Sequence, residues 1–263
     1  MPTARSKQID LDVTPYYHCH VRCVRKAYLC GIGENQKDYN HRRGWIETRL
    51  QHLIKAFAID IASYAIMNNH YHVVLHVDRQ QALSWEKEEV IQRWALVTKI
   101  NPKGTYPGKE IKKWRGNLYS ISWFMRFLNE SIAINANQED KVTGRFWEGR
   151  FKSKALTDEG AVLACMAYND LNPIRGGIAQ TLESSEYTSI QKRLEAFREK
   201  RSTPQFLMDF QSEEVPETPV SKPIMSESID STSTPIKKIM KSTLPFALTD
   251  YITLVDWTGR QIR

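Results

Sequence analysis

The chain has 263 residues, 41% of them hydrophobic, and a net charge of +7. This length predicts one large domain, or one domain with an appendage, and no stretch approaches the roughly 18 uninterrupted apolar residues of a membrane helix. The N-terminus has no apolar signal core and the four cysteines form no dense framework, so we expect a cytoplasmic protein with free thiols and no membrane partner. The positive charge favours an acidic partner, most commonly nucleic acid, although a basic protein without such a partner is the plain alternative.

The first half of the chain alternates strand and helix patterns. Residues 13–24 are rich in β-branched and aromatic types, which predicts a strand. Residues 43–58 carry apolar side chains at helical spacing. Strands are expected at 59–67 and 70–77, and Asn68-Asn69 between them predicts a tight turn and an antiparallel hairpin.

The middle of the chain is predicted to be mostly helical. Residues 79–97 have a helical pattern, whereas 100–117 are punctuated by proline and glycine and predict a basic loop. Apolar residues within 118–137 form one helical stripe. Residues 144–156 are expected to be a strand or the edge of a hairpin.

The next helix is expected to begin after Thr157, a natural N-cap, and to stop before Pro173. The main domain is expected to span residues 1–200, and its last helix covers roughly 185–200. Residues 201–245 are rich in Ser, Thr, Pro and Glu and predict a flexible linker, and 246–263 recover apolar residues and form a short C-terminal appendage. The order of elements predicts an α+β fold with one mainly antiparallel sheet and helices packed on it.

Two histidines mark the third predicted strand. His70 and His72 are separated by one residue, so they share one face of the strand while Tyr71 faces the other way. That geometry presents two nitrogen ligands to one cation, although two hydrogen-bonded histidines in the core would give the same pattern. His76 shares the face but lies roughly 13 Å along the strand, too far to bind the same ion.

A second H-x-H pair, His18 and His20, lies in the first predicted strand near three cysteines. A structural zinc site using these residues is one alternative. The cysteines lack the C-x2-C spacing that makes such a site convincing, which favours an ordinary half-buried strand.

Tyr168 and Asn172 are four residues apart on a predicted helix, away from the stripe formed by Val162, Leu163 and Met166. A phenol can act as a nucleophile and an amide oxygen can bind a hard metal ion. Polar residues on an exposed helix face give the same pattern without any chemistry.

Basic and aromatic residues alternate in "GRFWEGRFKSK" and continue after the helix. Cations on one strand face suit a phosphate backbone, and an aromatic side chain can stack on an unpaired base. For Trp147 a place in the core is the alternative. The candidate DNA contacts are Arg145, Trp147, Arg150, Lys152, Lys154 and Arg175.

Four segments occur in a recognisable order: "NNHYHVVLHV" (68–77), "FMRFLNESIAINAN" (124–137), "GRFWEGRFKSKAL" (144–156) and "YNDLNPIRGG" (168–177). This ordered set resembles the single-tyrosine HUH transposases, and within them the REP-associated tyrosine transposases and their insertion-sequence relatives. The resemblance covers roughly residues 13–190.

The resemblance implies a ferredoxin-like core and a metal-dependent single-stranded DNA endonuclease and strand transferase. It implies Tyr168 as the nucleophile that forms a 5′-phosphotyrosine, and His70, His72 and Asn172 as ligands of Mg²⁺ or Mn²⁺. Insertion-sequence members often carry glutamine at the position of Asn172; because asparagine is one methylene shorter, the helix must lie closer to the ion.

The implied partner is single-stranded DNA beside a hairpin or repeat, and a monomer and a homodimer that shares active sites both remain open. The alternatives are a non-catalytic or domesticated DNA-binding protein, a nickase that initiates replication or relaxes plasmids, and the zinc protein described above.

Overall fold

The computed structural model describes residues 8–24, 28–33, 36–211 and 242–262. Its centre is a four-stranded antiparallel sheet in the order β2-β3-β1-β4. The strands are β1 (Tyr16–Arg22), β2 (Ile59–Ile66), β3 (His70–Val77) and β4 (Lys152–Leu156). The turn between β2 and β3 is closed by a hydrogen bond of 2.8 Å from the Met67 amide to the His70 carbonyl, so the expected hairpin is present.

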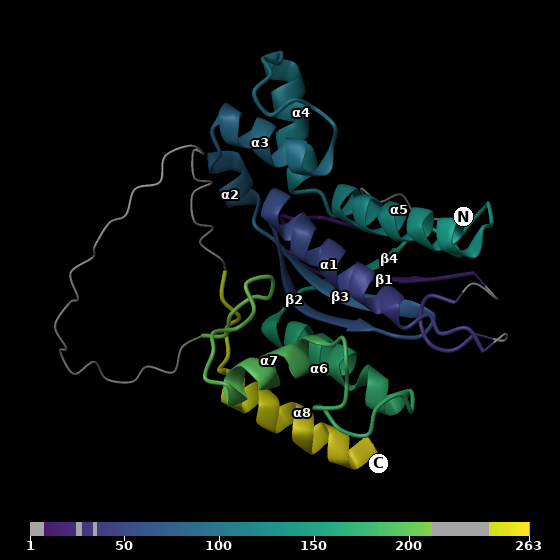
Figure 1. Ribbon diagram of the computed structural model, residues 1–263. Helices are drawn as coiled ribbons and strands as arrows, with labels where there is room; N and C mark the ends of the chain where they lie inside the picture. Colours follow the sequence, from purple (N-terminus) through teal and green to yellow (C-terminus); the bar gives the residue numbers. More distant parts are fainter. Residues whose placement is uncertain (1–7, 25–27, 34–35, 212–241, 263) are drawn as a thin grey trace, which may run out of the picture.

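Helices cover both faces of the sheet (Figure 1). The helices on one side are α1 (His41–Ala56), α2 (Arg79–Ser84), α3 (Lys87–Val97), α4 (Gly108–Leu118) and α5 (Ile121–Asp140). Those on the other side are α6 (Glu159–Arg175), α7 (Ser189–Arg198) and α8 (Leu248–Ile262), with α8 outermost. A β-α-β-β-α-β succession with this strand order is the ferredoxin-like arrangement, so the predicted α+β class is confirmed.

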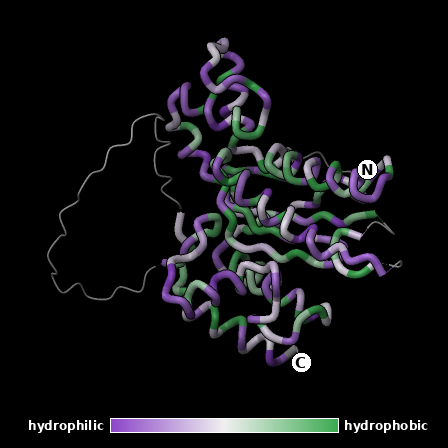
Figure 2. Tube along the Cα trace, in the orientation of Figure 1, coloured by the Kyte–Doolittle hydropathy of each residue, from purple (hydrophilic) through white to green (hydrophobic). Residues whose placement is uncertain are grey.

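The alternation of side chains along β1 and β3 divides the core into two layers. Tyr17, Cys19 and Leu75 lie in the cluster beneath α1 and α5, and Val74 lies in the cluster beneath α6. Figure 2 shows hydrophobic positions gathered along the strands, with hydrophilic positions frequent on the outer helices. Helices therefore cover both faces of the two central strands. A polar side chain that points toward α6 lies in a packed environment between the sheet and that helix.

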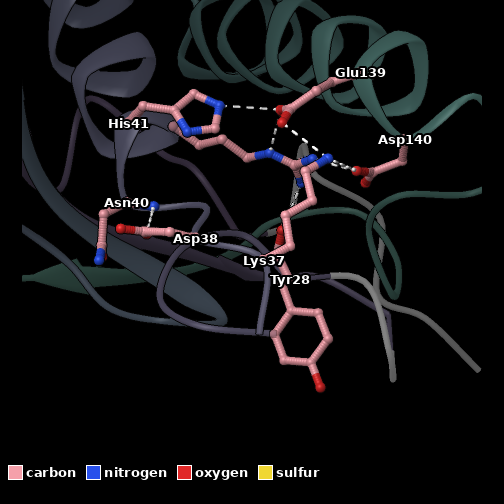
Figure 3. A network of polar contacts seen from close by, with 8 residues as sticks. Tyr28, Lys37, Asp38, Asn40, His41, Glu139 and Asp140 are labelled. Atoms are coloured by element: carbon pink, nitrogen blue, oxygen red, sulfur yellow. Dashed lines mark hydrogen bonds and ion pairs between the residues drawn. The ribbon is translucent and has the colours of Figure 1, made fainter. Parts of the chain in front are cut away.

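A network of ion pairs joins Lys37 and His41, before and at the start of α1, to Glu139 and Asp140 at the end of α5 (Figure 3). The fully buried Arg42 donates through Nε to Glu139 at 2.9 Å and through a second nitrogen to Asp140, while Lys37 and His41 also contact Glu139. Burial alone would raise the pKa of Glu139, but hydrogen bonds from Arg42, Lys37 and His41 outweigh it and lower that pKa to about 2. This network joins the start of α1 to the end of α5 at one edge of that helical layer.

The basic loop expected at 100–117 is wrong in its second half, because α4 occupies Gly108–Leu118. Ile111, Trp114 and Leu118 recur at helical spacing and are buried, and the Trp114 ring stacks on Trp94 at 6.4 Å. Burial of this face overcame the proline and glycine signals. The Arg115 guanidinium donates to the carbonyl groups of Ala82 in α2 and of Trp85 just after it, which the sequence alone did not suggest.

Several helices and strands also begin or end at residues other than those expected. The helix expected at 79–97 is two helices, α2 and α3, separated at Trp85 and Glu86. In 144–156 only the last five residues, β4, form a strand. The preceding residues make one isolated bridge between Trp147 and Cys23, because the glycines at 144 and 149 interrupt a regular ladder.

Helix α6 begins and ends differently from the prediction. Asp158, not Thr157, is the N-cap, and its carboxylate accepts a hydrogen bond of 2.7 Å from the Ala161 amide. The helix continues through Pro173 to Arg175. A proline in the last turn removes only one donor, and its own carbonyl still accepts from the amides of Ile178 and Ala179.

The C-terminal part of the described chain packs on α6 and α7. Tyr251 and Val255 of α8 are buried in the cluster beneath that layer. Phe206 and Met208, at the start of the expected linker, are also buried, whereas 212–241 lie outside the described residues. No described helix combines the length and the apolar run that a membrane crossing requires.

Candidate active site

The two H-x-H pairs form one cluster. His20 on β1 lies directly opposite His72 on β3, and the strand alternation turns His18 and His70 to the same face of the sheet. The ring of His72 lies 5.1 Å from that of His18, 5.4 Å from that of His20 and 4.9 Å from that of His70, measured between ring centroids. This face is the one covered by α6.

The zinc site considered for His18, His20 and the cysteines is not formed. Cys19 lies between the two histidines in sequence, so its side chain points to the opposite face, where it is fully buried beneath α1 and α5. Cys23 is buried in the same layer. Across the described part of the chain, no group of three or more His, Cys, Asp or Glu side chains is placed to hold a metal ion.

The rings of His70 and His72 are each held at Nδ1. For His70 the partner is the Asn69 side-chain oxygen at 2.6 Å. This oxygen can only accept, so Nδ1 of His70 carries the proton and Nε2 keeps its lone pair. For His72 the partner is Nε2 of His18 at 2.9 Å. Nε2 of His70 is therefore available for a further ligand, and Nε2 is the ring nitrogen of His72 that the contact with His18 leaves without a partner.

The surroundings keep the imidazoles neutral. Burial, then the neighbouring histidines, lowers the pKa of His72 to about 2. Burial, then Arg22, lowers the pKa of His70 to about 4, and burial, then His20, lowers that of His18 to about 4. Neutral imidazole is the form that binds a metal ion.

Helix α6 places Tyr168 over this cluster. Its ring lies 5.7 Å from the His72 ring at 89° and 6.5 Å from the His18 ring, between centroids. Tyr168 is 43% exposed, so the phenol is accessible beside a mostly buried group of histidines. The neighbouring turn is anchored: Asn169 donates to the Ser63 hydroxyl of β2 at 3.0 Å, and both groups are fully buried.

Asn172 follows Tyr168 by one helical turn and is buried, with 9% of its surface exposed. Its side-chain nitrogen has no hydrogen-bond partner, and neither has Nε2 of His72. Unpartnered buried polar atoms are uncommon in folded proteins and need an explanation. Amide oxygen and nitrogen are interchangeable by a 180° rotation, so Asn172 can offer its oxygen in the same direction.

These residues fit a divalent cation. Two imidazoles with free Nε2 atoms and one amide oxygen are a donor set suited to Mn²⁺ or Mg²⁺, with the nitrogen donors favouring Mn²⁺. Three protein donors leave coordination positions for water or a substrate oxygen. The donors are His70, His72 and Asn172.

Cations surround the cluster on the same face. Lys154 pairs with His18 across the β1–β4 ladder and Lys152 pairs with His20, and both lysines are exposed. Arg22, which no sequence pattern singled out, pairs with His70 and is exposed. Three positive groups at the rim suit a phosphate backbone that passes over the histidines.

Other predicted DNA contacts lie elsewhere. The Trp147 ring packs against Tyr71 at 5.9 Å, and its Nε1 donates to the Asn129 carbonyl at 2.9 Å, which places it beneath α5 on the opposite face of the sheet. Arg150 lines a cavity of about 460 Å³ beside Trp147, and Arg145 lines a different cavity near the end of α5. The structure does not bring these three residues to the histidine cluster.

Arg175 does lie at the site. Its guanidinium carbon is 5.6 Å from the centre of the Tyr168 ring, a cation–π distance. Both residues also line a cavity of about 330 Å³ between α6 and α8, to which Leu254 and Thr258 of α8 contribute. The C-terminal helix therefore lies beside the helix that carries the tyrosine.

Comparisons with known proteins gave one structural likeness. No family model matches the chain, and no curated protein matches it. The chain is similar in structure to a REP-associated tyrosine transposase. That solved structure has a REP hairpin bound; the likeness covers 81% of this chain and 93% of that chain, with 8% sequence identity and a TM-score of 0.45.

Proposed function

We propose that this protein is a metal-dependent endonuclease and strand transferase that acts on single-stranded DNA beside a hairpin or repeat. Tyr168 is the nucleophile, and His70, His72 and Asn172 hold a divalent cation, Mg²⁺ or Mn²⁺. Lys152, Lys154 and Arg175 contact the DNA backbone, which agrees with the net charge of +7.

One observation carries this proposal: an accessible phenol lies beside a cluster of neutral, mostly buried imidazoles. The Tyr168 and His72 rings are 5.7 Å apart, and they come from different elements, α6 and β3. Nε2 of His72 and the side-chain nitrogen of Asn172 have no hydrogen-bond partners, as expected of groups that would face a cation, and Nε2 of His20 in the same cluster also has none.

The chemistry follows from these positions. A bound divalent cation would withdraw charge from the scissile phosphate and stabilise the leaving oxygen. The Tyr168 oxygen attacks phosphorus, the bond to the 3′-oxygen breaks, and the DNA fragment is left as a 5′-phosphotyrosine. The phenol proton passes to solvent, because the side chain is 43% exposed, and the released 3′-oxygen takes up a proton. A second 3′-hydroxyl reverses the step and joins two strands.

The test incubates the full chain with Mn²⁺ and single-stranded DNA that carries a hairpin beside a random sequence and a label at its 3′ end. A covalent protein–DNA adduct is expected with the native protein and none with Tyr168→Phe or His72→Ala. Tyr16→Phe is the matched control, because Tyr16 lies on the same sheet face but contacts His76, at 4.7 Å between ring centroids. It should form adduct normally.

The alternatives give different results. Equal adduct from the native protein and Tyr168→Phe would remove Tyr168 from the reaction. Binding of the DNA without cleavage by any variant would favour a non-catalytic DNA-binding protein.

A further inference from the structure

The histidines of β1 have no role in the proposed reaction, yet one of them makes the closest contact in the cluster. Nε2 of His18 lies 2.9 Å from Nδ1 of His72, and the two rings are nearly parallel, with 13° between their planes. One nitrogen must donate and the other accept, so this contact fixes where both rings carry their protons.

Only one of the two arrangements leaves His72 able to bind a metal ion. If His18 donated, Nδ1 of His72 would accept and Nε2 of His72 would carry the proton, which would block coordination there. If His72 donates from Nδ1, its Nε2 keeps a free lone pair. That Nε2 atom is buried and without a hydrogen-bond partner, so a proton on it would have no acceptor.

The neighbouring histidine shows the same device. Nδ1 of His70 lies 2.6 Å from the side-chain oxygen of Asn69, and with the amide in this orientation the ring nitrogen donates. His18 contacts Nδ1 of His72 in the same way that Asn69 contacts Nδ1 of His70. Metal-binding histidines commonly donate their second ring N–H to such a partner, which orients the ring and makes it a better donor.

We infer that His18 is a positioning residue: its Nε2 accepts the Nδ1 proton of His72 and so directs the free Nε2 of His72 toward the divalent cation. This inference rests on the proposed function only for the presence of the cation. Strand β1 therefore contributes His18 to the site, a role that the two H-x-H patterns taken separately did not indicate.

The test measures the site without DNA. Nitrogen-15 NMR of the metal-free protein reports which ring nitrogen of each histidine is protonated, and His72 is expected to be protonated at Nδ1. Calorimetric titration with Mn²⁺ alone gives the affinity. His18→Ala should lower the affinity about 10- to 100-fold, and His18→Gln, whose amide oxygen can accept the same proton, should recover most of it.

His76→Ala is the matched control, because His76 lies on the same strand and face but pairs with Asp60 at 3.4 Å. It should leave Mn²⁺ binding unchanged, and circular dichroism checks that each variant is folded. A spectrum with His72 protonated at Nε2, or unchanged affinity in His18→Ala, would overturn the inference. Loss of affinity in both His18 variants with the His72 proton still on Nδ1 would make His18 a direct ligand and overturn it too.

Failure of the proposed function would be seen separately. A protein that forms no DNA adduct but shows this proton assignment and the His18-dependent Mn²⁺ affinity would retain the inference and lose the endonuclease.

Discussion

Removal of the Tyr251 hydroxyl should weaken the contact between α8 and α6, the helix that carries Tyr168. The Tyr251 hydroxyl of α8 donates to Asp170 of α6, and both residues are almost fully buried. Asp170 also accepts from the Ser189 hydroxyl at 2.6 Å and from the Ile190 amide at 3.1 Å. Tyr251→Phe keeps the ring, which packs on Phe210 at 5.3 Å between centroids, and removes only this donor.

The expected cost follows from the charge of the acceptor. A hydrogen bond to a charged group contributes about 1.5–3 kcal/mol, whereas one between neutral groups contributes about 0.5–1.5 kcal/mol. Burial raises the pKa of Asp170, and hydrogen bonds from Ser189 and Tyr251 oppose that rise. Asp170 accepts three hydrogen bonds and Arg193 lies nearby, which favours the charged form of this carboxylate. Tyr251→Phe should therefore lower the free energy of unfolding by roughly 2 kcal/mol.

Urea denaturation of the full chain at pH 8 measures this cost. Tyr71→Phe is the matched control, because the Tyr71 hydroxyl is equally buried but donates to the neutral side chain of Asn129, at 2.7 Å. It should cost about 1 kcal/mol. A Tyr251→Phe cost equal to or below that of Tyr71→Phe would refute the assignment of a charged hydrogen bond between α6 and α8.

Three further predictions concern the edge network, the rim cations and Trp147. Hydrogen bonds from Arg42, Lys37 and His41 lower the pKa of Glu139 to about 2, and because solvent screens these partly exposed groups, the network stabilises the fold by about 1 kcal/mol above pH 4.5. That stability is lost as the pH falls toward 2, and acid titration of unfolding should show a smaller loss in Glu139→Gln. Changing both Lys152 and Lys154 to Gln should weaken single-stranded DNA binding and reduce the slope of log affinity against log salt by about 0.7 per lysine; an unchanged slope would exclude them from the backbone contacts. Trp147→Phe should lower stability by about 1 kcal/mol while DNA affinity changes less than twofold, and a large loss of affinity at full stability would return Trp147 to the DNA interface.

The sheet could be predicted from the sequence because its strands are short runs of strand-forming residues with clear ends. The hairpin at Asn68-Asn69 is an example, since two polar turn residues separate two apolar strands. Local composition gave a wrong prediction where burial against the rest of the fold determined the secondary structure. Residues 108–118 contain glycine and lysine, yet Trp114 and Ile111 are buried and hold a helix there.

The site could be predicted only in pieces. The strand period places His70 beside His72, and the helix period places Asn172 one turn after Tyr168. The approach of α6 to β3 depends on packing between elements far apart in sequence, which no local pattern contains. The same holds for His18: the matching H-x-H spacing on β1 was a visible signal, but only the register that sets His20 opposite His72 joins the two pairs.

The central claim is that the Tyr168 oxygen becomes bonded to DNA, and mass spectrometry of the trapped adduct tests it most directly. After nuclease and protease digestion, we expect a 5′-phosphonucleotide on the peptide that contains Tyr168 and on no other tyrosine. A modified peptide carrying Tyr16, another tyrosine or a serine, with the Tyr168 peptide unmodified, would contradict it.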